Sequence, residues 1–216
     1  MSAPRPATLV VVLGTGTEVG KTWVACRVAE ALRVRGRSVA AWKPTQSWDP
    51  AERAAGALTD AELLAAATGQ RPDEVCPPPR SYPLAVAPPM AADRLGRPPL
   101  ALRDLLAEQP WPPDVQVGLV ETAGGARSPL AHDADGVDLA RALAPDLVVL
   151  VADAGLGTLH AVRSTLDGTA GLTVVVALNR YDDGDDLHRA NRGWLAERDG
   201  LDVVTDPADL AARLDR

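Results

Sequence analysis

LVVVLGTGTEVGKT, residues 9–22, is the stretch of sequence that decides the fold. Its first half predicts a buried strand, its second half predicts a glycine-rich loop, and helical periodicity follows over residues 21–35. A loop between a strand and a helix N-terminus presents successive backbone N–H groups to an anion. In the Gly-Lys-Thr that ends this loop, Lys21 can reach phosphate oxygens and the Thr22 hydroxyl can ligate Mg²⁺. The stretch therefore predicts a nucleoside triphosphate site at Thr15–Thr22.

Along the whole chain, short valine-rich runs alternate with helical periodicities. The runs are Leu9–Leu13, Ser38–Trp42, Val115–Val120, Leu147–Val151 and Leu172–Leu178. The helical patterns cover Lys21–Arg35, Asp60–Ala67, Leu100–Glu108, Gly136–Ala144, Leu159–Leu166 and roughly Asp186–Arg198, and the tail suggests a strand at Asp202–Thr205 and a helix from Pro207. Such alternation is typical of parallel strands joined by right-handed crossovers. We expect a three-layer α/β fold of the P-loop NTPase kind, with a mostly parallel sheet and helices on both faces.

The segment Arg71–Pro99 breaks this alternation. Its nine prolines interrupt any helical period, so we expect an irregular excursion rather than a helix. Long connections in compact domains are often functional. A structural crossover and a loop that covers a substrate are both compatible with the sequence.

Length and charge limit the classes of partner. The 216 residues, 46% of them apolar, suffice for one core, so we expect a single domain over residues 1–216. A net charge of −7 disfavours nucleic acid and anionic membranes as partners. No apolar segment of the kind found in signal peptides precedes Leu9, and the apolar runs are too short to span a membrane, which favours a cytoplasmic protein.

Polar residues follow the second and third apolar runs, where a parallel sheet gathers its ligands. Lys43 would lie near the phosphates there, although by pattern alone a solvated lysine is the favoured interpretation. Glu121 emerges from the third run and suits Mg²⁺, which prefers hard oxygen ligands. Asp60 opens a predicted helix, where a favourable interaction with the helix dipole is the alternative to metal binding.

Taken together, these segments resemble the dethiobiotin synthetase family of P-loop enzymes over most of the chain. The family's loop, G-T-x-T-x-V-G-K-T, is present unchanged at Gly14–Thr22, including Thr15, where the general phosphate-loop pattern has glycine. Further matches are Lys43–Ser47 to K-P-x-x-[ST], Asp60 to a helix-opening aspartate, Val120–Gly125 to V-E-G-A-G-G, Asp153–His160 to D-x-x-L-G-T-[IL]-N-H, and Asn179 to an asparagine that contacts the nucleotide base.

The resemblance implies a concrete reaction with ATP and Mg²⁺ as cofactors. It is the carboxylation of 7,8-diaminopelargonate by CO₂ or bicarbonate, followed by closure of the ureido ring of dethiobiotin. A carbamate of the substrate attacks the γ-phosphoryl group, and the second amine then attacks the resulting anhydride. The resemblance also implies a homodimer with substrate bound near the two-fold axis.

The resemblance further implies roles for individual residues. Thr22, Asp60 and Glu121 would hold Mg²⁺, while Lys21 and Lys43 would act in catalysis by neutralising charge on the reacting oxygens. The implied nucleotide contacts are Thr17, Glu18, Val19, Gly20, Lys21, Thr22, Trp23, Asp60, Glu121, Thr122, Ala123, Gly124, Asn179 and Arg180. The implied substrate contacts are Thr17, Ser47, Leu156 and His160.

Four positions depart from the family pattern. Trp48 and Thr122 stand where glycine is usual, so Thr122 is expected to intrude where backbone passes close to ligand. His160 stands where asparagine is usual, and it could bind a substrate carboxylate or cap a helix. Arg180 differs from the expected residue and leaves the selectivity for the nucleotide base open.

Two alternative functions are compatible with the same loop. One is a related P-loop ligase that acts on another amine, although this chain has no glutaminase domain to supply ammonia. The other is a switch ATPase of the ParA/MinD kind, which predicts a basic surface or an amphipathic tail. ATP hydrolysis without a substrate would favour the switch, and strict dependence on a diamine and bicarbonate would favour the ligase.

Overall fold

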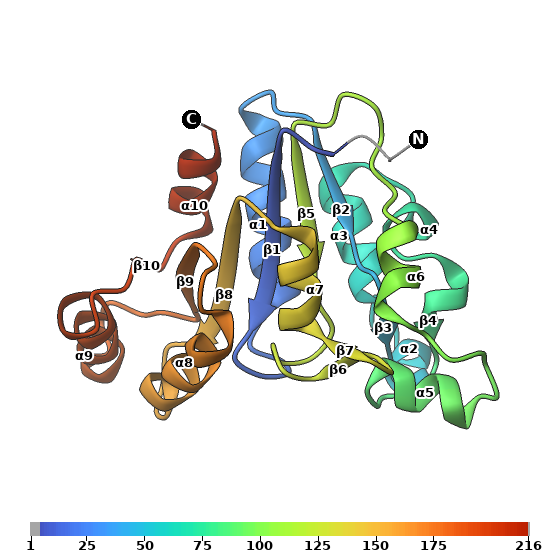
Figure 1. Cartoon of the computed structure of the whole chain (residues 1–216). Helices are drawn as coiled ribbons and strands as arrows, with labels where there is room; N and C mark the ends of the chain where they lie inside the picture. Colours follow the sequence, from blue (N-terminus) through green and yellow to red (C-terminus); the bar gives the residue numbers. More distant parts are fainter. Residues whose placement is uncertain (1–4, 216) are drawn as a thin grey trace.

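A six-stranded parallel sheet forms the centre of the fold (Figure 1). A computed structural model describes residues 5–215. The strand order is β10-β9-β8-β1-β5-β2, and every neighbouring pair is parallel. The strands are β1 (Thr8–Gly14), β2 (Val39–Trp42), β5 (Val117–Glu121), β8 (Leu147–Asp153), β9 (Val174–Asn179) and β10 (Val203–Val204). The predicted parallel sheet is confirmed, and each predicted run supplies one of its strands.

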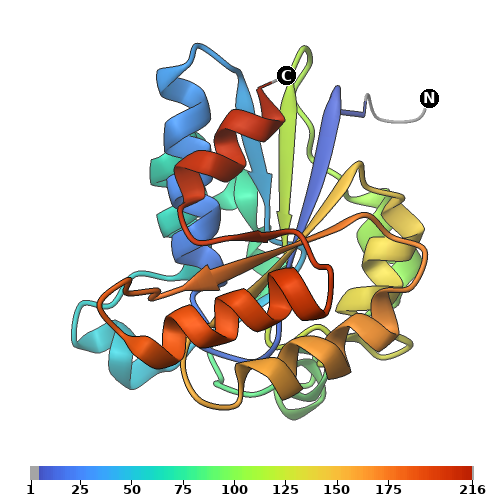
Figure 2. The same ribbon diagram turned by 90° about the vertical axis from the view of Figure 1, so that its left-hand side faces the viewer.

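Helices cover both faces of the sheet, as the alternating pattern predicts (Figure 2). One layer consists of α1 (Lys21–Val34), α3 (Asp60–Thr68) and α10 (Pro207–Leu214). The other contains α6 (Leu102–Ala107), α7 (Gly136–Leu143), α8 (Thr158–Leu166) and α9 (Asp186–Gly193). The pattern predicts one helix over 186–198, whereas the structure ends α9 early and continues it as a π-helical turn at Trp194–Arg198.

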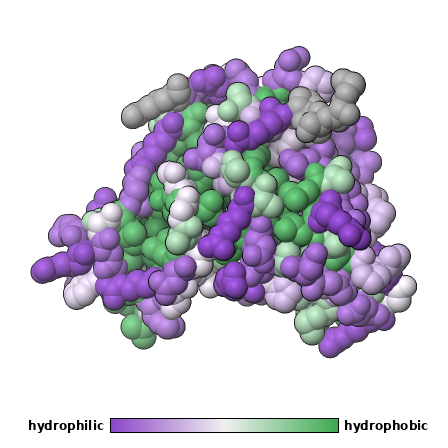
Figure 3. Space-filling view, in the orientation of Figure 1, coloured by the Kyte–Doolittle hydropathy of each residue, from purple (hydrophilic) through white to green (hydrophobic). Residues whose placement is uncertain are grey.

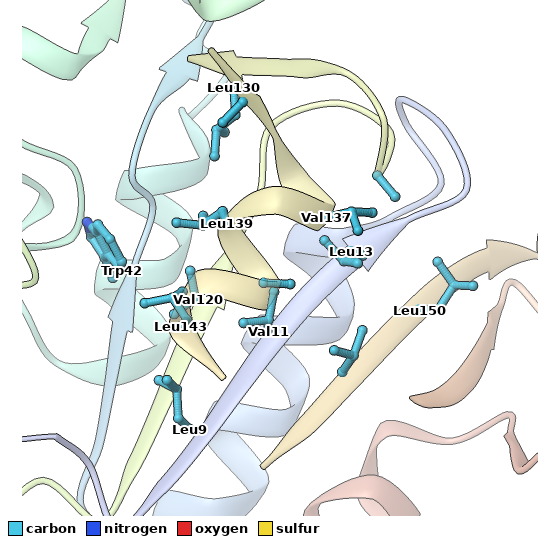
Figure 4. Close-up of a cluster of buried hydrophobic side chains, with 14 of the residues drawn as sticks. Leu9, Val11, Leu13, Trp42, Val120, Leu130, Val137, Leu139, Leu143 and Leu150 are labelled. Atoms are coloured by element: carbon cyan, nitrogen blue, oxygen red, sulfur yellow. The ribbon is translucent and has the colours of Figure 1, made fainter. Parts of the chain in front are cut away.

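Strand β1 separates two hydrophobic layers because successive side chains of a strand point to opposite faces. Leu9, Val11 and Leu13 pack in the cluster that contains Leu139 and Leu143 of α7 (Figure 4). The intervening Val10 and Val12 join the cluster that contains the inner face of α1. Burial on both faces explains why this strand reads as a continuous apolar run.

The direction of the strands determines where a ligand can bind. Parallel strands bring their carboxyl ends to one edge of the sheet, and open α/β sheets bind ligands there. This edge carries the glycine-rich loop after β1, Lys43 after β2, Glu121 at the end of β5 and Asn179 at the end of β9. Residues that are far apart in sequence are therefore placed around one site.

The expectation of no helix between residues 71 and 99 is wrong. The segment contains α4 (Pro72–Val75), a 3₁₀ turn (Pro78–Arg80), β4 (Ser81–Tyr82) and α5 (Pro88–Arg94). Prolines occupy the first turn of both helices, where a missing N–H costs nothing. Strand β4 pairs with β3 (Gln46–Ser47), and α5 contacts β6 (Pro129–Ala131), which pairs with β7 (Ala134–Asp135). The prolines thus begin short helices that sequence periodicity alone does not reveal.

A histidine–aspartate pair connects α5 to the loop after β6. The His132 Nε2 atom lies 3.0 Å from Oδ1 of Asp93, and this hydrogen bond raises the pKa of His132. Because the folded-state pKa is the higher one, the pair stabilises the fold fully below about pH 6.5 and loses this contribution as pH rises through the folded-state pKa.

We expect Asp93→Asn to lower the thermal midpoint by about 1–3 °C near pH 5.5 and to leave it unchanged near pH 8.5. Thermal unfolding followed by circular dichroism at the two pH values checks this. Asp73→Asn is the control, since Asp73 pairs with Arg71 and not with a histidine. An Asp93→Asn effect of equal size at both pH values would contradict the prediction.

The length and apolar character of the helices within residues 5–215 bear on whether one could span a membrane. None of the helices described there has the length and apolar character needed to cross a bilayer. On the face seen in Figure 3, hydrophilic residues form much of the raised surface and hydrophobic residues lie mainly between them.

Candidate active site

The glycine-rich loop is held in a defined shape between β1 and α1. The Thr15 N–H donates to the Val151 carbonyl at 2.9 Å, which ties the loop to β8. Gly20 adopts a left-handed φ of 92°, and a Cβ there would lie 2.0 Å from Nδ2 of Asn179. Only glycine fits this position. The strand, loop and helix predicted from residues 9–22 are confirmed.

Lys21 lies inside this loop. It is buried, and its Nζ donates to the Gly16 carbonyl at 3.2 Å. Burial, and then the charge of nearby Lys43, lowers the pKa of Lys21. An ammonium group has three donors, so Lys21 keeps further hydrogens for phosphate oxygens. Its position suits the role that the sequence predicts.

Lys43 is buried between two carboxylates. Its side chain is 1% exposed, and its Nζ lies 2.5 Å from Oε1 of Glu121 and 2.7 Å from Oδ2 of Asp60. Burial disfavours the charged form, but the two carboxylates outweigh this effect and raise the pKa of Lys43. Lys43 is therefore positively charged at neutral pH, and the alternative of a solvated lysine is wrong.

The oxygen atoms beside Lys43 fit a magnesium ion. The Thr22 hydroxyl lies 2.9 Å from Oδ1 of Asp60 and 2.8 Å from Oε1 of Glu121, yet its single hydrogen can serve only one of them. The other Glu121 oxygen, Oε2, is buried and has no hydrogen-bond partner among the described residues. Mg²⁺ takes hard oxygens from few side chains and completes its shell with phosphates and water. Residues 5–215 hold no group of three or more His, Cys, Asp or Glu side chains suited to a metal, so this mixed set is the candidate.

A cavity of about 760 Å³ opens over these groups. The predicted site residues in its lining are Thr17, Glu18, Gly20, Lys21, Thr22, Lys43, Ser47, Asp60, Glu121, Ala123, Gly124 and Arg180. The Ser47 hydroxyl is buried and unpartnered among the described residues, so it can still bind a ligand. The cavity brings the two lysines, the magnesium candidates and a free hydroxyl together, which suits phosphoryl transfer to a small molecule.

A second cavity of about 370 Å³ adjoins the first. Gly20 and Arg180 line both cavities, and Trp23 and Asn179 line only this one. Most of its wall is apolar, with contributions from β9 and the start of α10. An apolar pocket beside a phosphate loop is suited to a nucleotide base. Val19 lines neither cavity, but its carbonyl accepts a hydrogen bond from Asn179 Nδ2 at 3.0 Å.

The two departures at glycine positions have different consequences. Thr122 is fully buried, its hydroxyl donates to the Val12 carbonyl at 3.3 Å, and it lines neither cavity. The expected intrusion of Thr122 on the ligand is therefore wrong, because its side chain points into the protein. Trp48 does line the large cavity, and its Nε1 donates to the Ser81 hydroxyl at 3.0 Å. Trp48 is the departure that changes the shape of the site.

Leu156 and His160 lie outside both cavities. Leu156 is 93% exposed, and His160 is exposed on α8 with Ser164 as its hydrogen-bonding neighbour at 3.5 Å. Within one chain, neither Leu156 nor His160 lines the cavity that contains Lys43. Their predicted contact with the substrate stays a prediction that depends on a second subunit.

Several residues of the large cavity escape sequence reasoning. They are Asp49 and Glu52 near the start of α2 (Pro50–Ala54), Ala85–Pro88 at the start of α5, and Ser128. No spacing or residue type marks them. The pairing of β3 with β4 brings the segments that carry Asp49 and Ala85–Pro88 together. The presence of Ala85–Pro88 in the lining favours the substrate-covering alternative for the proline-rich segment.

Comparisons with known proteins agree with this geometry. Residues 8–183 match the family model described as an AAA domain. The signal recognition particle receptor FtsY of Elizabethkingia anophelis superposes with a TM-score of 0.56 at 13% identity, covering 100% of this chain and 67% of that one. The chloroplast FtsY of Physcomitrella patens gives a TM-score of 0.52 at 18% identity, covering 100% of this chain and 67% of the other. At such identities the likeness concerns the α/β P-loop fold alone.

Curated relatives are more similar in sequence. The ATP-dependent dethiobiotin synthetase BioD of Anaeromyxobacter dehalogenans is 35% identical over 211 residues, covering 94% of this chain and 92% of that protein. The protein of the same name from Caulobacter vibrioides is 40% identical over 160 residues, covering 72% of this chain and 71% of the relative. Residues 8–183, which the family model matches, include the phosphate loop, Lys43 and Glu121. From sequence and site together, the chain belongs to the ATP-dependent dethiobiotin synthetase family.

Proposed function

We propose that this protein catalyses the ATP- and Mg²⁺-dependent carboxylation and ring closure of 7,8-diaminopelargonate, giving dethiobiotin, ADP and phosphate. The observation that carries the proposal is the charged Lys43, buried against Glu121 and Asp60 and lining the same cavity as Lys21. Two ammonium groups around one cavity suit a reaction in which negative charge gathers on phosphoryl and carbamate oxygens.

The chemistry proceeds in three steps. One substrate amine attacks CO₂, forms an N–C bond and loses a proton, which gives a carbamate. A carbamate oxygen then attacks the γ-phosphorus of ATP, and the bond from that phosphorus to the ADP oxygen breaks. Finally the second amine attacks the carbamate carbon, loses a proton and expels phosphate, which closes the five-membered ureido ring.

The residues divide this work by position. Lys21 binds the β- and γ-phosphates, and Lys43 stabilises charge on the transferring group from the same cavity. Thr22, Asp60 and Glu121 would hold Mg²⁺, which neutralises phosphate charge. Thr17 and the free Ser47 hydroxyl would orient the reacting amine or carbamate. Asp49 and Glu52 place negative charge on the same wall, which suits a cationic diamine.

The far end of the substrate would meet a second copy of the chain. The exposed Leu156 and His160 suit contacts across a two-fold axis in a homodimer. The net charge of −7 disfavours nucleic acid and anionic membranes as partners, and the proposed reaction is that of a cytoplasmic enzyme of small molecules.

We expect phosphate release by the purified protein to require all of ATP, Mg²⁺, bicarbonate and 7,8-diaminopelargonate. Dethiobiotin should form in equal amount to the phosphate, and EDTA should stop both until excess Mg²⁺ is added. Coupled phosphate detection with mass spectrometry of the product measures these quantities. Phosphate release that continues without the diamine would contradict the proposal and favour the switch ATPase.

A related ligase that acts on a different amine is the second candidate, and Trp48 is the observation that favours it. The indole lines the large cavity where the family has glycine, so it takes up space beside the substrate. Release of phosphate with another diamine but not with 7,8-diaminopelargonate would establish this alternative.

A further inference from the structure

Two neighbouring residues at the end of β9 hold two neighbouring carbonyls of the phosphate loop. Asn179 Nδ2 donates to the Val19 carbonyl at 3.0 Å, and Arg180 Nη2 donates to the Glu18 carbonyl at 2.9 Å. The loop is thus fixed from outside by a strand that lies two positions away in the sheet.

The geometry of the peptide bond gives these contacts a consequence inside the loop. In a trans peptide the C=O of one residue and the N–H of the next point in opposite directions, and no cis peptide bond occurs among the described residues. Holding the carbonyls of Glu18 and Val19 outward therefore turns the N–H groups of Val19 and Gly20 inward. Inward N–H groups are the donors that bind phosphate in such a loop.

Arg180 is itself held in place. Both Arg180 and Glu18 have left-handed backbones, with φ values of 56° and 60°, which side chains other than glycine adopt at a cost unless their surroundings fix them. Arg180 Nη1 lies 2.9 Å from Oδ2 of Asp153, whose other oxygen accepts from the Gly155 N–H at 2.9 Å. The guanidinium consequently bridges the end of β8 and the loop, and Arg180 lines both cavities.

We propose that Arg180 is a positioning residue for nucleotide binding, which orients the phosphate-binding N–H groups of Val19 and Gly20 through the Glu18 carbonyl. This inference rests on the proposed binding of a nucleoside triphosphate at the loop. It assigns Arg180 a role in the phosphate part of the site, distinct from selection of the base. A lysine cannot replace it, because one ammonium cannot reproduce the planar, two-sided bridge.

The test compares Arg180→Gly with the wild type. Glycine adopts the observed φ without cost, so the variant removes the bridge and leaves the backbone free to keep its shape. We expect the Kd of Mg·ADP, measured by isothermal titration calorimetry, to rise about 10- to 100-fold, as for loss of a charge-assisted hydrogen bond. The thermal midpoint without nucleotide should stay within about 3 °C.

Two further variants define the mechanism. Arg180→Lys should recover less than half of the binding free energy that Arg180→Gly loses. Its single ammonium can reach the Glu18 carbonyl or Asp153, but not both. Arg163, which lies on α8, makes an exposed ion pair with Asp199 through two hydrogen bonds. The control variant Arg163→Ala removes this pair and should leave the Kd of Mg·ADP unchanged. Arg180→Gly should also bind Mg·pyrophosphate, which lacks the base and ribose, more weakly than the wild type does. The factor should be similar to that for Mg·ADP.

Three results would overturn the inference. They are a Kd for Arg180→Gly within twofold of the wild type, full rescue by Arg180→Lys, and a loss seen with ADP but not with pyrophosphate. Binding and product formation are measured separately. If the wild type binds Mg·ADP but forms no dethiobiotin, the proposed reaction is overturned. The binding data for the Arg180 variants then still decide whether Arg180 positions the loop.

Discussion

Replacing Lys43 by methionine should reduce kcat for ATP-dependent product formation by about 10²–10³-fold, with a much smaller change in the Kd of ADP. Methionine has a similar length and no charge, so the variant removes a preorganised positive group from the cavity. In the proposed reaction, Lys43 acts where charge develops during transfer, whereas Lys21 and the loop amides bind the phosphates of the ground state. Steady-state kinetics beside calorimetric ADP binding measure the two effects separately.

The same change should also affect stability. Glu121 is 1% exposed, and loss of Lys43 leaves its carboxylate buried without its cation, which costs about 3–5 kcal/mol. The double variant Lys43→Met, Glu121→Gln removes both charges and should recover most of that stability while remaining inactive. Urea unfolding measures the stabilities. A double variant that regains activity together with stability would show that Lys43 acts only on folding.

Replacing Gly20 by alanine should lower kcat/KM for ATP by at least about 100-fold. The new Cβ would lie 2.0 Å from Nδ2 of Asn179, so either that side chain or the loop must move. Movement breaks the Asn179 hydrogen bond to the Val19 carbonyl and turns a phosphate-binding N–H away. Kinetics at varied ATP concentration check this result.

Gly36→Ala is the matched control for Gly20→Ala. Gly36 ends the turn after α1 with a similar left-handed φ of 81°, but among residues 5–215 no heavy atom other than those of its chain neighbours lies within 4 Å of its added Cβ. It should therefore lose about 1–2 kcal/mol of stability through the backbone alone and keep its activity. Equal losses of activity in the two variants would indicate that backbone strain, and not the Asn179 contact, is responsible.

Sequence reasoning predicts the sheet and the phosphate loop well because both depend on local patterns. The run Leu9–Leu13 is buried on both faces, and the loop has its own residue signature. The alternation of strands and helices then fixes which loops share the carboxyl edge. Lys43 and Glu121 could be placed near one another on this basis, whereas the resemblance alone brought Asp60 to the site and gave the roles of all three.

The remaining parts of the site depend on contacts between distant segments. Asp49 and Ala85–Pro88 enter the cavity through two-residue strands, which are too short to leave a periodic pattern. Thr122 and Trp48 also could not be distinguished from the sequence, because both replace glycine in the family pattern. The structure shows that the Thr122 side chain is buried in the protein and that Trp48 lines the cavity. The bridge made by Arg180 depends on left-handed backbones that no propensity predicts.

The segment Pro78–Arg97 has its own small hydrophobic cluster, formed by Tyr82, Ala91 and Ala92, apart from the two layers that enclose the sheet. Ala85–Pro88 from this segment line the large cavity, while the phosphate-binding loop and Lys43 belong to the sheet edge. Part of the cavity wall is thus built outside the two layers that carry the phosphate-binding loop. A substitution within Ala85–Pro88 can therefore change this wall while the sheet and the phosphate-binding loop keep their packing.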